Sequence, residues 1–105
     1  MDCLFCNIVN GKTDTEILFE NENLAVFKDI HPKAPVHLLI VPKKHIESIN
    51  ELKESDKGLL GEMILQAGEM AKKSGVEKGY RLIFNIGKKA GQEIDHIHLH
   101  LLGFK

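Results

Sequence analysis

Short runs of apolar residues, separated by polar turn-forming residues, predict a chain that is rich in β-strands. The first two runs flank residues 21–23 (Asn-Glu-Asn), which favour a hairpin turn between them. The third run follows Pro35 and is almost wholly apolar, as is typical of a buried strand. The five predicted strands are residues 17–20, 24–29, 36–42, 80–85 and 96–102.

One long segment shows helical periodicity instead. Between Ser55, a good N-cap, and Gly75, a suitable residue just past a helix end, apolar residues recur three and four positions apart. Weaker patterns favour a short helix or turn over residues 2–9 and a short helix over residues 45–52. The apolar stripe of the long helix comprises Leu59, Leu60, Met63, Ile64, Ala67, Met70 and Ala71.

This order of elements predicts an α+β fold, a five-stranded antiparallel sheet with one main helix on one face. One helix covers only one face of a sheet. We therefore expect the other face to hold a ligand site, a dimer interface or both. The length of 105 residues indicates a single domain over residues 1–105.

Charge and hydropathy exclude several classes of partner. The net charge is −1 and the lysines are scattered, so no broad basic face is available for long nucleic acid. No apolar run approaches the roughly 18 residues of a membrane helix, and the first residues lack the features of a signal peptide. We therefore expect a cytoplasmic protein with no membrane partner.

Cys3 and Cys6, the only cysteines, form a C-x-x-C pair. In a reducing compartment such a pair more often binds metal or performs redox chemistry than forms a structural disulfide. A thioredoxin-like motif should lie between a strand and a helix, whereas this pair lies at the extreme N-terminus.

The densest chemical signal is the alternation of His96, His98 and His100 with apolar residues. On a strand, alternation with period two places the three imidazoles on one face. They can hold a catalytic metal that keeps one position open for water, or one of them can be a nucleophile that its neighbours assist. The spacing alone does not decide between these two interpretations.

Residues elsewhere in the chain favour phosphate as the ligand of this face. His37 begins the third strand, Asn85 ends the fourth, and Gly91-Gln92 precede the histidines. Amide donors and a glycine backbone suit phosphate oxygens, where developing charge must be met by fixed dipoles.

Three blocks of the sequence resemble the histidine triad family, in its branch of nucleoside phosphoramidate hydrolases. The blocks are AVFKDIHPKAPVHLLIVPKKHI from Ala25, GYRLIFN from Gly79 and GQEIDHIHLHLLG from Gly91. The resemblance covers the chain from about Cys3 to Gly103. It implies a histidine-triad fold and a purine nucleoside phosphoramidase that acts on AMP or GMP conjugates, needs no organic cofactor and forms a homodimer.

The resemblance also implies roles for individual residues. His98 would attack the α-phosphorus and form a nucleotidyl-histidine, while the backbone carbonyl of His96 holds its other ring nitrogen. His100 would contact the phosphate and help to protonate the leaving amine, and His37 would orient the site. Water would then release the nucleoside monophosphate.

Nucleotide-binding roles follow from the same resemblance. Asp29 would accept hydrogen bonds from the two ribose hydroxyls, and Asn85 and Gln92, with the backbone of Gly91, would contact the phosphate or the leaving group. An apolar pocket for the base would be walled by Leu4, Phe5, Ile8, Phe27 and Ile30.

A subset of the family binds structural zinc, and this implies a Cys₂His₂ site formed by Cys3, Cys6, His45 and His96. Strict alternation places His96 on the face of His98, so zinc binding requires a twist or a strand end at Asp95-His96. Asp95, where many relatives carry an apolar residue, could then accept a hydrogen bond from a zinc-bound imidazole.

Three alternative functions stay open at this point. The same site could serve a dinucleoside polyphosphate hydrolase. The chain could also be a nucleotide-binding regulatory module with little turnover, or a zinc hydrolase that uses all three triad histidines.

Overall fold

The computed structural model describes residues 3–105, so residue 2 of the predicted 2–9 segment lies outside the described part. This part contains five strands, two α-helices and three short 3-10 helices. In chain order they are α1 (Leu4–Val9), β1 (Phe19–Glu20), β2 (Leu24–Lys28), β3 (Val36–Pro42), the 3-10 helices Ile49–Glu51 and Glu54–Asp56, α2 (Lys57–Lys73), β4 (Tyr80–Ile83), the 3-10 helix Lys88–Ala90 and β5 (Leu99–Gly103).

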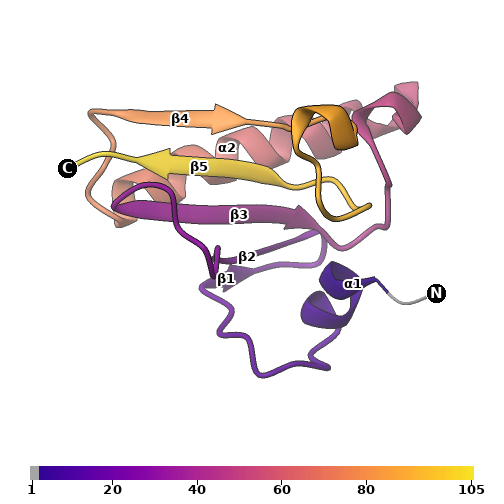
Figure 1. Ribbon diagram of the computed structural model, residues 1–105, viewed down its shortest axis with the longest axis horizontal. Coiled ribbons are helices and arrows are strands. Elements are labelled where there is room, and N and C mark those ends of the chain that lie inside the picture. Colours follow the sequence, from indigo (N-terminus) through magenta and orange to yellow (C-terminus); the bar gives the residue numbers. More distant parts are fainter. Residues whose placement is uncertain (1–2) are drawn as a thin grey trace.

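The strands form one antiparallel sheet in the order β1-β2-β3-β5-β4 (Figure 1). The last strand of the chain therefore lies inside the sheet, between β3 and β4. This pairing brings Leu39 of β3 opposite His100 of β5, and His100 opposite Ile83 of β4. The predicted α+β fold with a five-stranded antiparallel sheet is confirmed.

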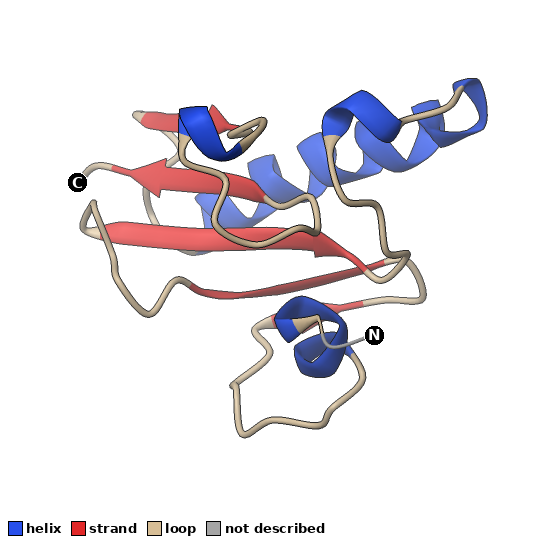
Figure 2. Cartoon of the chain, turned by 45° about the vertical axis from the view of Figure 1, so that its right-hand side comes forward, coloured by secondary structure: helices blue, strands red, loops and turns tan. Residues whose placement is uncertain are grey.

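The sheet separates two apolar clusters. Helix α2 covers one face, where its buried residues Met63, Ala67 and Met70 pack against alternate residues of β2, β3 and β5 (Figures 1 and 2). These strand residues are Leu24, Val26, Leu38, Ile40, Leu99 and Leu101. At roughly 25 cal/mol per Å² of buried apolar surface, this core is the main source of stability.

On the opposite face, α1 covers only part of the sheet (Figure 2). Phe5, Ile8 and Val9 of this helix pack against Phe27 and Leu39 of the sheet. The prediction that one main helix covers one face is correct, and α1 leaves the rest of the second face available for a ligand.

The start of α2 and one residue of its apolar stripe differ from the prediction. Ser55 is not its N-cap, because a 3-10 turn over Glu54–Asp56 precedes the helix. The buried Asp56 carboxylate fixes this turn by accepting hydrogen bonds from the Lys53 N–H at 2.9 Å and the Lys44 ammonium at 2.8 Å. Ile64, predicted in the buried stripe, is 49% exposed.

Gly75 ends α2 as predicted. Its φ of 72° is left-handed, a conformation that favours glycine. The Gly75 N–H donates to the Lys72 carbonyl, and the Val76 N–H donates to the Ala71 carbonyl. These two bonds form a Schellman motif, which satisfies carbonyls that the helix end leaves free.

The fifth strand is shorter than predicted, since it begins at Leu99 instead of His96. A bend at Asp95-His96 precedes it, and the Ile97 N–H donates to the carbonyl of Ile46 at 2.7 Å instead of pairing with a strand. Two of the triad histidines therefore lie outside the strand. The segment 45–52 that supplies this partner is mostly irregular and holds only the 3-10 helix Ile49–Glu51.

In the described part of the chain, no helix has both the length and the apolar character needed to cross a membrane.

Candidate functional site

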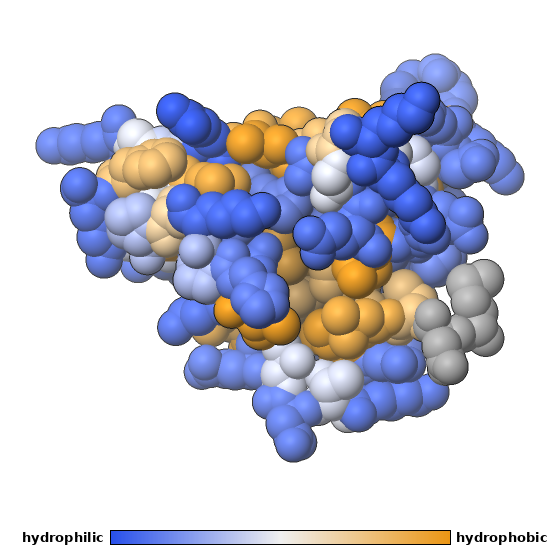
Figure 3. Space-filling view, viewed as in Figure 1, coloured by the Kyte–Doolittle hydropathy of each residue, from blue (hydrophilic) through white to orange (hydrophobic). Residues whose placement is uncertain are grey.

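A cavity of about 420 Å³ opens on the face of the sheet that carries α1. Figure 3 shows this face, on which hydrophobic residues gather in the middle and polar residues surround them. Ten of the predicted catalytic and nucleotide-binding residues line the cavity: Leu4, Phe5, Ile8, Phe27, Asp29, Ile30, Asn85, Gly91, His98 and His100. Residues far apart in the sequence thus converge on one site, while their individual roles stay predictions.

His98 is 8% exposed, and its Nδ1–H donates to the carbonyl oxygen of His96 at 2.7 Å. This is the hydrogen bond expected from the sequence, and it leaves Nε2 with a free lone pair. The edge of the Phe5 ring packs against the imidazole, with the ring centroids 4.8 Å apart. Burial lowers the pKa of His98 below its usual value, although the bond to His96 opposes this shift. The imidazole is therefore neutral and nucleophilic at neutral pH.

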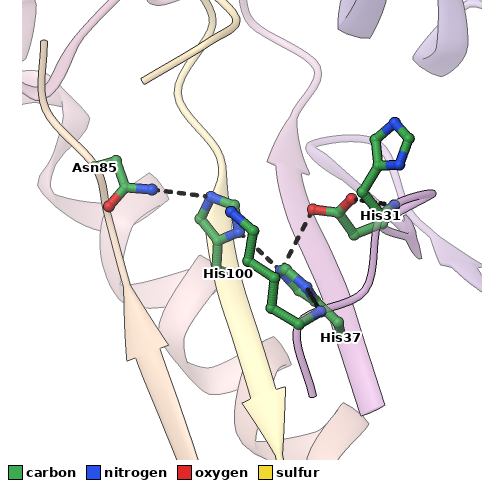
Figure 4. A network of polar contacts seen from close by, with 6 residues as sticks. His31, His37, Asn85 and His100 are labelled. Atoms are coloured by element: carbon green, nitrogen blue, oxygen red, sulfur yellow. Dashed lines mark hydrogen bonds and ion pairs between the residues drawn. The ribbon is translucent and has the colours of Figure 1, made fainter. Parts of the chain in front are cut away.

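A chain of hydrogen bonds fixes the orientation of His100 (Figure 4). The Lys33 backbone N–H donates to His37 Nδ1 at 3.1 Å, so the hydrogen of a neutral His37 is on Nε2. Nε2 lies 3.0 Å from His100 Nδ1 and 3.4 Å from the Asp29 carboxylate. His100 then carries its own hydrogen on Nε2, which lies 3.5 Å from the amide nitrogen of Asn85; both atoms are donors in this tautomer, so this contact is not a hydrogen bond.

Both imidazoles of this chain are uncharged at neutral pH. Burial lowers the pKa of His37, which Asp29 partly offsets. Burial, together with the nearby His98, His37 and Lys33, lowers the pKa of His100 to about 4. His37 does not line the cavity, and its contact with the site is the one that it makes with His100 Nδ1.

Gln92 is not brought to the cavity. Its buried amide donates to the carbonyls of Glu47 at 2.7 Å and Ile94 at 3.1 Å, and it accepts from the Gly87 N–H at 2.9 Å. These contacts hold the loop before the triad against the segment after β3. The predicted contact of Gln92 with phosphate finds no support in this geometry.

Cys3, Cys6, His45 and His96 form a separate cluster, in which one donor atom from each lies within 4.8 Å of the others. His96 Nδ1 lies 3.3 Å from Cys3 Sγ, 3.5 Å from Cys6 Sγ and 3.2 Å from His45 Nδ1. With zinc bonds of about 2.0–2.3 Å, donor atoms at the corners of a tetrahedron are about 3.3–3.8 Å apart. The donor types and their spacing therefore fit zinc.

The orientation of His96 also suits metal binding. Its Nε2–H donates to the Pro42 carbonyl at 2.7 Å, which leaves the lone pair of Nδ1 facing the cysteines. Asp95, expected as a possible acceptor for this imidazole, is exposed, and the backbone of Pro42 takes that place. The bend at Asp95-His96 turns the two side chains in different directions.

The triad is thus divided between two sites. His98 and His100 line the cavity with ring centroids 4.9 Å apart, whereas His96 belongs to the cysteine cluster. The three imidazoles do not converge on one point, so the geometry does not support a hydrolytic metal held by all three.

Several cavity residues were not predicted from the sequence. Charged and polar examples are Thr15, Lys28, His31, Lys33 and Glu93. Lys33 lies in the block of the sequence that starts at Ala25, four residues before His37, and this proximity was the available signal.

Comparisons with known proteins agree with this geometry. Residues 2–105 match the family model described as "Scavenger mRNA decapping enzyme C-term binding". The protein HitA of Neisseria gonorrhoeae is 39% identical over 102 residues, which cover 97% of this chain and 95% of that protein. A HIT family hydrolase from Legionella pneumophila has 48% identity and a TM-score of 0.95, over 97% of this chain and 92% of its own. A HIT family hydrolase from Clostridium thermocellum has 45% identity and a TM-score of 0.94, over 97% of this chain and 90% of its own.

Proposed function

Because this chain belongs to the histidine triad family, we propose that it is a nucleotide hydrolase that cleaves nucleoside phosphoramidates through a covalent intermediate on His98. Similar proteins described as HIT family hydrolases support hydrolysis as the reaction class. The single observation that carries the proposal is the state of His98. It is a neutral imidazole whose Nδ1–H is held by a backbone carbonyl, and it lines a cavity of nucleotide size.

In the first step, the lone pair of His98 Nε2 attacks the α-phosphorus. The bond from phosphorus to the leaving nitrogen breaks, and its electron pair stays on that nitrogen. Negative charge on the bound phosphate raises the proton affinity of His100, so this imidazole takes up a proton from solvent when the nucleotide binds. The resulting imidazolium donates one proton to the leaving amine and returns to the neutral form.

In the second step, a water molecule attacks the phosphorus of the nucleotidyl-histidine. The bond from phosphorus to Nε2 breaks, and its electron pair returns to His98. A proton of the water passes to the neutral His100, which then releases it to solvent and so returns to the starting state. The net reaction adds one water to the phosphoramidate and gives a nucleoside monophosphate and an amine.

The rest of the cavity provides for binding of the nucleotide. One oxygen of the Asp29 carboxylate accepts a hydrogen bond from the His31 N–H at 2.8 Å. The remaining lone pairs of the carboxylate are available for ribose hydroxyls. Phe5 and Phe27, with ring centroids 5.6 Å apart, provide an apolar wall suited to a purine base.

Zinc enters the proposal only as a structural ion. Cys3, Cys6, His45 and His96 would hold it, and a closed site of four protein ligands supplies folding energy instead of a reactive water. No step of the reaction passes through the metal.

The test is to replace the nucleophile and to look for the adduct. His98→Ala should lower hydrolysis of an adenosine phosphoramidate by at least about a thousandfold while AMP binding persists, because the nucleophile is lost but the pocket is kept. AMP binding is measured by calorimetry, and folding is checked by circular dichroism. Mass spectrometry of the unaltered protein, quenched during turnover, should find a nucleotidyl group on His98.

Other outcomes would favour the alternatives. Turnover without an adduct, unaffected by His98→Ala, refutes the covalent mechanism. AMP binding with no hydrolysis of any conjugate favours a regulatory module. Preferential cleavage of a dinucleoside polyphosphate favours that class of substrate.

A further inference from the structure

The cavity is lined by two lysines that the proposed mechanism does not use, and one of them, Lys33, is linked by its backbone to the proposed proton donor. Besides the histidines, its charged lining residues are Lys28, Asp29, Lys33 and Glu93. Asp29 is engaged by the His31 N–H and lies 3.4 Å from His37. The exposed ammonium of Lys33, in contrast, has no hydrogen bond or ion pair with any side chain among residues 3–105.

The position of residue 33 relative to the reacting groups is fixed by its backbone. Its N–H donates to His37 Nδ1 at 3.1 Å, and His37 Nε2 lies 3.0 Å from His100 Nδ1. The backbone of Lys33 is therefore connected, through the His37 imidazole, to His100, the proposed proton donor. This contact uses only the backbone of Lys33, so its side chain remains available for a ligand.

The two imidazoles of the reacting centre have different charged neighbours besides Asp29, which acts on both. Burial is the largest cause of the lowered pKa of His100; the negative charge of Asp29 opposes this shift, and the positive charge of Lys33 adds to it. Near His98 the acidic neighbours are Asp29 and Glu93, which act in the opposite direction to burial on its pKa. Lys33 thus lies toward His100, and Glu93 lies toward the nucleophile.

Displacement at phosphorus places the leaving atom in line with the nucleophile and on the opposite side of phosphorus. In the proposed function, on which this inference rests, His100 protonates that atom. The leaving group must then emerge on the side of His100 and Lys33. We propose that Lys33 is a specificity-determining residue that binds an anionic group on the leaving group, so that the preferred substrates are nucleotide conjugates with a negatively charged leaving group.

A lysine ammonium is a compact point charge on a flexible stem, suited to a carboxylate or a phosphate without demanding one geometry. The leaving group can therefore be an amine that carries a carboxylate, or a further phosphoryl group. A neutral leaving group would make no ion pair with the Lys33 ammonium.

The closest matched probes are the adenosine phosphoramidates of glycine and of glycinamide, which differ mainly by one negative charge. For the unaltered protein, we expect kcat/KM to be higher with glycine, and the preference to shrink as salt rises, because exposed charge pairs are screened. Lys33→Met should lower the glycine-to-glycinamide ratio by about three- to fivefold, the size of one exposed ion pair. Lys33→Glu should invert the preference, and Lys33→Arg should retain it.

Lys78→Met is the matched control. It removes the same charge from an exposed position between α2 and β4, outside the cavity, and should keep the ratio of the unaltered protein. Diadenosine triphosphate, whose leaving group is ADP, is compared in the same variants to separate phosphate from carboxylate as the anion. If Lys33→Met lowers its hydrolysis by a larger factor than it lowers the glycine-to-glycinamide ratio, the site prefers a phosphoryl leaving group.

Equal loss with both glycine and glycinamide probes in Lys33→Met, or an unchanged ratio in Lys33→Glu, overturns the inference. A failure of the proposed function gives a different result, because the unaltered protein would then turn over none of the probes. In that case, calorimetry with non-hydrolysable phosphonate analogues of the two probes still tests Lys33. A preference for the anionic analogue that Lys33→Met removes supports the assignment, and equal affinities overturn it.

Discussion

At the scale of single residues, burial keeps the cavity imidazoles neutral, and this has a consequence for stability. The pKa of His100 is lowered to about 4, from an ordinary value of 6.5. Between these pH values the unfolded chain binds a proton that the folded protein does not. The free energy of unfolding should therefore fall as pH decreases from 6.5 towards 4, and His37 and His98 act in the same direction.

Urea denaturation at pH 7 and pH 5, with metal content held constant, measures this loss. His100→Asn removes one of the groups that bind the extra proton on unfolding, so its stability should depend less steeply on pH. An imidazole NMR titration of folded His100 with a midpoint near 6.5 would contradict the explanation.

At the scale of an element, α1 links the metal cluster to the cavity. A helix of six residues is not stable alone, so its position depends on tertiary contacts. Its Cys6 and the N-cap Cys3 face His45 and His96, while Phe5 packs against Phe27 and His98. The same short helix thus carries metal ligands and part of the wall of the proposed base pocket.

Loss of the metal should therefore weaken nucleotide binding. We expect Cys6→Ser to lower zinc content, to speed hydrogen exchange over residues 4–9 and to weaken AMP binding severalfold, because α1 loses part of what holds it against the cavity. Zinc content is measured by elemental mass spectrometry and affinity by calorimetry. Asn7→Ser, on the same helix but outside the cluster, is the control and should behave as the unaltered protein does.

Unchanged AMP affinity in a Cys6→Ser protein that has lost its metal would show that α1 is held by apolar packing alone. Since zinc binding requires the cysteines to lose their protons, metal affinity should also fall with decreasing pH. Burial raises the pKa of the Cys6 thiol, which makes this dependence steeper near neutral pH.

At the scale of the whole molecule, β4 leaves one edge of the sheet unpaired in the single chain. Its Tyr80 hydroxyl comes close to Gly68 of α2, so this edge adjoins the helix. Near it, Leu65 of α2 is 76% exposed. An open strand edge beside exposed apolar residues is a suitable docking surface, and we propose it as the interface of the homodimer, which itself stays a prediction.

We expect sedimentation velocity to show a dimer at micromolar concentration. Leu65→Glu should weaken its association by about tenfold or more, because a charge would be buried in an apolar contact. Leu18→Glu, beside β1 at the opposite edge, is the matched control and should leave the dimer intact. A monomer at all concentrations, or equal effects of the two substitutions, would refute this interface.

The local pattern of the sequence was sufficient for much of the architecture. Short apolar runs between turn-forming residues located all five strands, and the stripe from Leu59 to Ala71 located α2, because these patterns depend only on neighbouring residues. The block from His96 to Leu102 indicated the family and the pair His98 and His100. The ends of elements were less accurate, as at Ser55, where the Asp56 contacts with Lys53 and Lys44 decide the start of the helix.

The sequence by itself therefore determined the strands, the main helix, the family and the histidines that carry the proposed chemistry. The family resemblance implied that His96 joins Cys3, a residue 93 positions away, but only the tertiary structure decided that a bend turns it there and that Gln92 holds a loop. It also brought Lys33 next to the histidines. The physical reason is that periodicity encodes the direction of a side chain only within a regular element. Outside such an element, that direction is set by hydrogen bonds and packing with distant residues.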